Sequence, residues 1–186
     1  MSLLDILGNV LRPKRAAPVS GADVEFEKLG LELKGEIDRI FGRSLAIREV
    51  DSGSDNAAEI ELNNLSTPYY DVERFGVTFV ASPRHADVII ITGAVTLAMA
   101  EAVKKTYDAM PQPGWVIAVG DDACGAGILN DSYAVLGGAD KVLPVALKIP
   151  GNPPAPAEII GGLLSFMAMI RHEVGQPEKK TASPAV

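Results

Sequence analysis

Sulfur and imidazole ligands are scarce in this sequence of 186 residues, which contains one cysteine, Cys124, and two histidines, His85 and His172. A single cysteine excludes an internal disulfide and any cluster held by thiolates of this chain alone. Nucleophilic catalysis by Cys124 requires a neighbouring histidine. His85, in a loop before a predicted strand, is the candidate for that role, and a surface or packing role is the alternative reading of it.

Positive charge and long apolar runs are also lacking. A formal net charge of −7 and a pI near 4.8 exclude wide contact with nucleic-acid phosphates. The longest apolar run, residues 88–100, is interrupted by Thr92, Gly93 and Thr96 and is too short to span a bilayer. The sequence does not begin with a basic and then apolar leader, so we expect a cytoplasmic protein.

The composition is otherwise that of a folded protein, with 47% hydrophobic and 22% charged residues. We expect one domain over residues 23–174, preceded by a docking helix and linker over 1–22 and followed by a disordered polar tail over 175–186. No internal repeat is visible.

The first segment combines an apolar stripe with an abrupt end at residues 12–15, Arg-Pro-Lys-Arg. We expect this short helix to dock on a partner subunit or a membrane surface, because a polar segment separates it from the domain. Packing on its own domain is the alternative. The stripe consists of Leu3, Leu4, Ile6, Leu7, Val10 and Leu11.

Strand and helix patterns alternate through the rest of the chain. Such alternation predicts the α/β class, with a doubly wound, largely parallel sheet and helices on both faces. Pro144 places the last strand at a sheet edge or a bulge. The last helix is apolar almost all round, so we expect it to be buried on several sides. Strands are predicted over residues 44–50, 77–80, 87–92, 115–119 and 141–147, and helices over 23–41, 57–65, 95–110 and 156–174.

A glycine-rich loop over residues 120–127, Gly-Asp-Asp-Ala-Cys-Gly-Ala-Gly, follows the apolar strand 115–119. Open α/β sheets bind ligands at the carboxyl ends of such strands, so this loop is the candidate site. Asp121 and Asp122, together with Asp55, could bind a hard cation such as Mg²⁺; a solvated or hydrogen-bonded polar hollow is the favoured alternative. The loop lacks the lysine and glycine spacing of known nucleotide loops.

Several co-linear motifs between about residues 44 and 170 resemble the 20 kDa subunit of NADH–quinone oxidoreductase. They also resemble the related small subunit of membrane-bound nickel–iron hydrogenases of the formate hydrogenlyase type. The resemblance implies a flavodoxin-like fold. Its motifs are Asp-Val-Glu-Arg-Phe-Gly at 71–76, Ala-Ser-Pro-Arg at 81–84, Ala-Asp-Val at 86–88, Thr-Tyr-Asp-Ala-Met-Pro at 106–111, Gly-Asp at 120–121, Val145, Pro-Gly at 150–151 and Pro-Pro at 153–154.

In that family four cysteines hold one 4Fe–4S cluster, and the hydrogenase version begins with Cys-x-x-Cys-Glu. The resemblance places the four ligand positions on Asp55, Ala58, Asp122 and Asn152. None of these side chains is a thiolate, the soft ligand that cluster iron requires. We therefore expect no cofactor here and the loss of the family cluster.

Charged family positions near the cluster and the large-subunit contact correspond to Glu59, Glu73, Arg74 and Arg84. We interpret them, with the stripe of the first helix, as a partner interface. A solvated surface is the alternative for the charged residues. The expected partners are a large-subunit homologue (of the 49 kDa or hydrogenase-large type) and integral membrane subunits, without nucleic acid.

The favoured function is a redox-inactive structural subunit with no activity of its own. It would link the large-subunit homologue to membrane subunits and lie peripherally on the cytoplasmic face of the inner membrane. An electron-transfer subunit with a rerouted path, or with a cluster completed in trans, is the second hypothesis. An independent nucleotide- or flavin-binding protein is a third, less favoured because the apolar helices suggest obligate partners.

Overall fold

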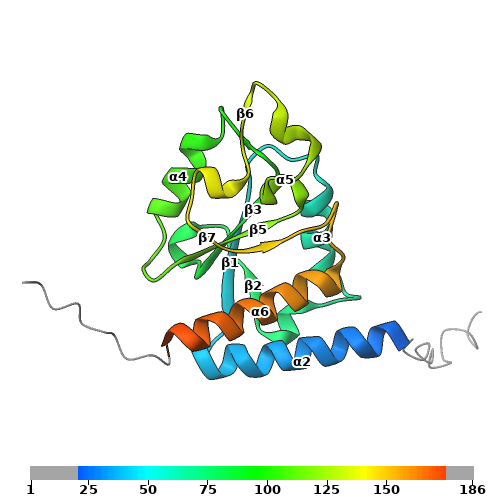
Figure 1. Ribbon diagram of the computed structural model, residues 1–186. Coiled ribbons are helices and arrows are strands. Elements are labelled where there is room, and N and C mark those ends of the chain that lie inside the picture. Colours follow the sequence, from blue (N-terminus) through cyan, green and yellow to red (C-terminus); the bar gives the residue numbers. More distant parts are fainter. Residues whose placement is uncertain (1–20, 175–186) are drawn as a thin grey trace, which may run out of the picture.

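The computed structural model describes residues 21–174, which form alternating strands and helices (Figure 1). The predicted first helix over 2–11, with its apolar stripe, and the predicted tail over 175–186 lie outside the described residues. In chain order the elements are α2 Gly21–Phe41, β1 Leu45–Asp51, α3 Ala57–Leu65, η1 Val72–Phe75, β2 Val77–Phe79, η2 Pro83–His85, β3 Val88–Thr92, β4 Val95–Thr96, α4 Ala100–Asp108, β5 Trp115–Val119, α5 Asp121–Cys124, η3 Ile128–Asp131, β6 Val135–Gly137, η4 Ala139–Lys141, β7 Val145–Ile149 and α6 Pro156–Val174.

Five strands form one parallel sheet in the order β2-β1-β3-β5-β7. The chain winds outward from β1 in one direction and from β3 in the other, which is the flavodoxin-like arrangement. The central strand β3 is a continuous buried run of β-branched residues, as parallel sheets covered on both faces require. This confirms the predicted doubly wound α/β fold.

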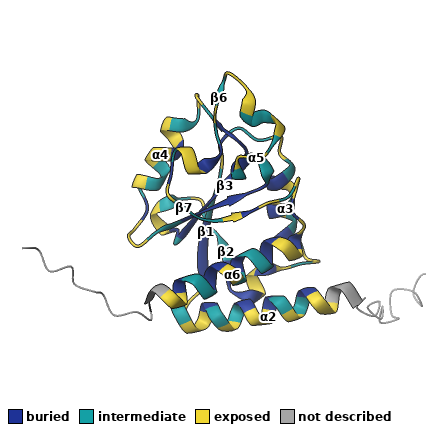
Figure 2. Ribbon diagram, in the orientation of Figure 1, coloured by how far each residue is buried: buried dark blue, intermediate teal, exposed yellow. Residues whose placement is uncertain are grey.

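Helices cover both faces of the sheet, and each face has its own apolar cluster. On one face α2, α3 and α6 pack over side chains such as Ile47, Ile90 and Ile117. On the other, α4, α5 and η4 cover Ile89, Ile91 and neighbouring residues. Figure 2 shows the result, with buried residues concentrated in the sheet and on the inward sides of the helices.

The helices α2 and α6 lie side by side beneath the sheet and run in the same direction (Figure 1). An ion pair of 3.2 Å between Arg171 Nη1 and Glu36 Oε1 joins their carboxyl-terminal halves. Gly42, with φ of +62°, ends α2, because a left-handed residue after the last turn stops helix propagation. Within residues 21–174, none of the helices has both the length and the hydropathy of a membrane span.

Most predicted elements occur within one or two residues of their expected bounds, but the segment 95–110 differs. Val95 and Thr96 form strand β4, which pairs antiparallel with β6, and the helix begins only at Ala100. Thr96 accounts for the difference, because its Oγ1 donates to the carbonyl of Ser52 (3.1 Å) and accepts from the Met99 amide (3.3 Å). The side chain thus ties this segment to the loop after β1.

The last strand also begins later than predicted. Residues 139–141 form a 3-10 turn, and β7 runs from Val145, just after Pro144. β7 is an edge strand, and its pairing with β5 shifts register between Val116 and Ile117. Both features agree with a proline at the start of an edge strand.

Replacing Asp87 tests how the start of β3 is held. Its carboxylate accepts two hydrogen bonds from Arg43 (2.6 and 2.8 Å) and one from the buried amide of Ala46 (2.9 Å). We expect Asp87→Ala to lower the free energy of unfolding by about 2 kcal/mol, mainly because the Ala46 amide loses its acceptor. Urea denaturation measures the change. Glu101→Ala, which breaks an exposed pair with Lys105, is the control and should stay within about 0.5 kcal/mol; equal losses in the two variants would contradict this account.

Candidate functional site

The loops that follow β1, β3, β5 and β7 meet at one edge of the sheet and surround a small hollow. All four positions that the resemblance assigns to cluster ligands line it: Asp55, Ala58, Asp122 and Asn152. They come from three separate stretches of the chain, so the fold brings together what the sequence separates. This edge is where open α/β sheets place their ligands.

The hollow is closed by hydrogen bonds between the segments that follow β5 and β7. The Asp121 amide donates to the Gly151 carbonyl (2.8 Å), and the Gly151 amide donates back to Asp121 Oδ1 (2.8 Å). The Gly120 amide donates to Ile149 (2.9 Å). The Asp121 carboxylate, a proposed cation ligand, is thus engaged in holding two loops together.

The remaining space is very small. The hollow has a volume of about 10 Å³, and a cavity needs roughly 10–15 Å³ to hold one water molecule. A Cβ atom on Gly120 would lie 3.4 Å from the Ala58 methyl group, so the loop after β5 packs closely on α3. A bound group larger than water would have to move these loops apart.

The donors around the hollow do not fit a 4Fe–4S cluster. Asp55 Oδ1 accepts from the Ala57 amide (2.9 Å) at the start of α3, and Ala58 has no donor atom. Asp122 Oδ1 is buried without a hydrogen-bond partner, and Asn152 is exposed and carries only an amide. Cluster iron takes thiolate sulfur, which none of the four side chains has. In the part of the chain that the structure describes, no three acidic, cysteine or histidine side chains gather as metal ligands.

Cys124, the sole cysteine, does not line this hollow. Its Sγ donates to the Ala118 carbonyl at 3.7 Å, a backbone partner rather than an imidazole. Burial raises the pKa of the Cys124 thiol to about 11, although the positive charge of Lys148 acts in the opposite direction. A thiol in this state is a poor nucleophile at neutral pH.

The raised pKa of Cys124 predicts slow alkylation. Because the thiolate is the reactive form, a shift from 9.0 to about 11 lowers its population near pH 8 about a hundredfold. We expect iodoacetamide to react with the folded chain about a hundredfold more slowly than with the chain unfolded in urea. Mass spectrometry between pH 7 and 10 should show the folded rate rising about tenfold per pH unit. A rate that levels off between pH 9 and 10 would show instead that the thiol ionises with its ordinary pKa of 9.0.

The four charged residues predicted at the partner interface do not form one cluster. Glu59 is buried on α3, only 7% exposed, and both carboxylate oxygens lack a hydrogen-bond partner among the described residues. Glu73 and Arg74 are exposed on η1, where Arg74 Nη2 pairs with Glu27 Oε2 of α2 at 2.8 Å. Arg84 is exposed on η2. Glu59 therefore lies in different surroundings from the other three.

Sequence reasoning missed two features. A pocket of about 270 Å³ lies between α3 and β1, and Glu49 lines it beside Glu59; two carboxylates ten residues apart gave no recognisable spacing. The second feature is an apolar tip around β4, η3 and β6, for which apolar residues inside a turn-rich segment were the available signal. Its exposed side chains are Leu97, Ile128, Tyr133 and Leu136.

Comparison with known proteins agrees with this architecture. The family model described as NADH ubiquinone oxidoreductase, 20 kDa subunit, matches residues 56–166, more than half of the chain. A chain of the membrane-bound sulfane sulfur reductase, an archaeal respiratory membrane complex, is 33% identical. The match covers 76% of this chain and 77% of that one, with a TM-score of 0.63.

A second solved structure supports the fold alone. A chain of an NAD⁺-reducing nickel–iron hydrogenase in the H₂-reduced state is 16% identical, with a TM-score of 0.55. The match covers 68% of this chain and 93% of that one. The family model and the 33% identical relative show that the chain belongs to the family of the 20 kDa subunit of NADH–ubiquinone oxidoreductase.

Proposed function

We propose that this chain is a redox-inactive structural subunit of a membrane-bound complex of the complex I and hydrogenase type. It links a large-subunit homologue to integral membrane subunits and lies peripherally on the cytoplasmic face of the inner membrane. The observation that carries the proposal is the hollow where four loops converge, whose four family ligand positions contain no sulfur. The loops of the site are retained, but the thiolate ligands are absent from these four positions.

Loss of the cluster would end electron transfer through this subunit. A cubane needs four soft ligands, whereas Asp55 and Asp122 are hard carboxylates and Ala58 has no donor. The one thiol, on Cys124, donates a hydrogen bond to the Ala118 carbonyl and does not line the hollow. Without a relay in this chain, the assembly must be driven by an ion gradient or by chemistry in a partner.

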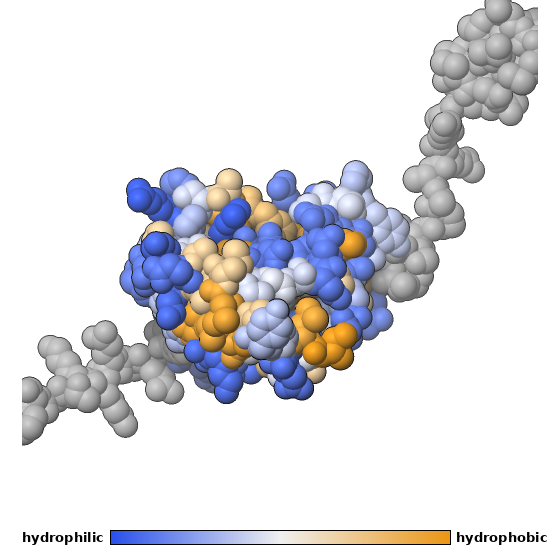
Figure 3. All heavy atoms as spheres, turned by 90° about the horizontal axis from the view of Figure 1, so that it is seen from above, coloured by the Kyte–Doolittle hydropathy of each residue, from blue (hydrophilic) through white to orange (hydrophobic). Residues whose placement is uncertain are grey.

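A binding role is supported by the surface at the top of the molecule. Figure 3 looks down on this end and shows apolar patches between hydrophilic regions. Ile128 and Tyr133 are 92% and 97% exposed. Leu136 lies on β6, and Leu97 directly follows β4. Exposed apolar patches of this kind are typical of protein–protein contacts. The similarity to a chain of a respiratory membrane complex supports partners of the same kind.

Purification of the assembly through a tag on this chain tests the proposal. We expect a large-subunit homologue and membrane proteins in fixed stoichiometry with the chain. After anaerobic reconstitution with iron and sulfide, the isolated full chain should hold no acid-labile sulfide and show no visible iron–sulfur absorption. A cluster bound between Asp55, Asp122 and Asn152 would overturn the proposal.

The alternative is an electron-transfer subunit whose path is rerouted or whose cluster is completed by another chain. It is favoured by the role of the 33% identical relative, which is part of a reductase. The intact assembly distinguishes the two functions. A cluster that contacts this chain in the complex, but is absent from the isolated chain, would support the alternative.

A further inference from the structure

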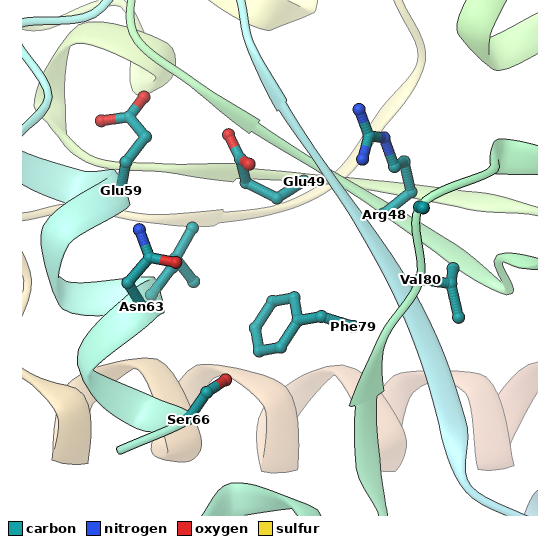
Figure 4. A pocket seen from close by; sticks show the side chains of 9 residues that line it. Arg48, Glu49, Glu59, Asn63, Ser66, Phe79 and Val80 are labelled. Atoms are coloured by element: carbon teal, nitrogen blue, oxygen red, sulfur yellow. The ribbon is translucent and has the colours of Figure 1, made fainter.

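The pocket beside α3 exists because β2 is short. β2 pairs only with Leu45–Ile47, so β1 continues past it from Arg48 to Asp51 without a neighbour on that side. The helix α3 covers part of this gap. The remaining space, about 270 Å³, is bounded by α3, β1 and the end of β2 (Figure 4).

Two carboxylates lie at the same side of this pocket, Glu59 from α3 and Glu49 from β1 (Figure 4). Glu59 is only 7% exposed, and neither of its oxygens accepts a hydrogen bond from the described residues. Glu49 accepts one long hydrogen bond, 3.4 Å from Thr92 Oγ1. Burial, followed by repulsion from Glu59, raises the pKa of Glu49. A buried carboxylate that accepts no hydrogen bond costs free energy. A cation beside Glu59 would offset this cost.

The described part of this chain does not supply that partner. Arg48 is the one basic residue that lines the pocket, and its guanidinium lies on the opposite side from Glu59 (Figure 4). No ion pair within residues 24–172 involves Arg48, Glu49 or Glu59. The missing charge therefore comes from outside residues 21–174.

The pocket walls suit an alkyl chain that ends in a cation. Phe79, Leu62 and Val80 provide apolar contacts for methylene groups, and Asn63 and Ser66 add polar groups along α3. A volume of 270 Å³ is far larger than a bare metal ion needs, whereas an extended lysine or arginine side chain fills it with stem and head group.

We propose that a lysine or arginine side chain of a partner subunit inserts into this pocket and pairs with Glu59, with Glu49 as the second acceptor. This inference rests on the proposed role as a subunit that binds a large-subunit homologue. It assigns to Glu59 a single contact that fixes the register of the two subunits. A buried, hydrogen-bonded charge pair is sensitive to the loss of one member, so this contact contributes strongly to specificity.

The isolated full chain tests the chemistry of the pocket with n-butylguanidinium as the probe. We expect calorimetric binding that Glu59→Gln weakens about tenfold or more. Glu61→Gln, which makes the same charge change on the same helix, should leave binding unchanged. The melting temperature of Glu59→Gln should be no lower than that of the unaltered chain, because the substitution removes an unpaired buried charge. This measurement excludes misfolding as the cause of weaker binding. Absence of binding at about 10 mM probe, equal effects of the two variants, or Glu59-dependent binding of Mg²⁺ instead would overturn the proposal.

A structure of the intact assembly identifies the occupant. We expect a lysine or arginine nitrogen of another chain within about 4 Å of a Glu59 oxygen. A metal ion, a water molecule or this chain's Arg48 in that place would overturn the inference. A cluster in the hollow beside Asp55 would defeat the proposed function but leave the pairing at Glu59 intact. An unpaired Glu59 in an assembly without a cluster would defeat only the pairing.

Discussion

A chain that carries cysteine at all four positions of the hollow is expected to bind about four iron and four sulfide ions, whereas the unaltered chain binds none. The variant combines Asp55→Cys, Ala58→Cys, Asp122→Cys and Asn152→Cys. All four positions already surround one point at the carboxyl edge of the sheet. Four thiolates there would recover the ligand set that cluster iron requires. Iron and acid-labile sulfide analysis after anaerobic reconstitution measures the gain.

The control for this experiment is the variant that keeps Ala58 and carries the other three cysteines. A cluster on three thiolates should lose iron more readily to a chelator, because one iron of the cubane lacks a protein ligand. The loops after β5 and β7 must move outward in the four-cysteine chain, since the hollow now has a volume of only about 10 Å³. A four-cysteine chain that folds, as judged by circular dichroism, but binds no iron would show that the positions no longer have cluster geometry.

Gly93→Ala is expected to lower the free energy of unfolding by about 3 kcal/mol. Gly93 follows β3 with φ of +72°, which disfavours any residue with a side chain. A Cβ atom there would lie 2.4 Å from the backbone nitrogen of Ser54, in the loop after β1. Backbone cannot turn aside as a flexible side chain does, so the two loops would separate and disturb the edge of the hollow. Urea denaturation measures the loss.

Gly35→Ala provides a matched control of opposite sign. Gly35 is exposed within α2, and a Cβ atom added to it would meet no atom within 4 Å. The substitution should raise the free energy of unfolding by roughly 0.5–1 kcal/mol, because alanine has less backbone entropy to lose in a helix. If both variants were equally stable, the close approach of the loops after β1 and β3 would not be a real constraint.

The sequence was sufficient to predict the fold where patterns were long or well bounded. The helix over 57–65 and the strand over 115–119 have their predicted bounds, because turn residues or Pro113-Gly114 delimit them. Strands β4 and β6 were missed, since two or three residues carry no periodicity. Thr96 belongs to β4 because of its bond to Ser52, a contact between residues far apart in the chain.

The site could be predicted only in part for the same reason. Family motifs located Asp55, Ala58, Asp122 and Asn152, and the structure brings them together. The closure of the hollow depends on hydrogen bonds between two loops, which no local pattern encodes. The pocket that Glu59 lines depends on β2 ending at Phe79, which no local pattern around Glu59 indicates.

The parallel pairing of α2 and α6 has a consequence for how the chain is synthesised. These helices come from opposite ends of the described chain, yet Leu33 and Ile37 on α2 share a core cluster with Phe166 on α6. Because the ribosome delivers α6 last, the sheet face that α2, α3 and α6 cover stays partly open to water until α6 has been synthesised. The opposite face is covered by α4, α5 and η4, which are synthesised before α6, so it can close first. The apolar surface of the nascent chain is therefore exposed for longest on the face that α2 covers.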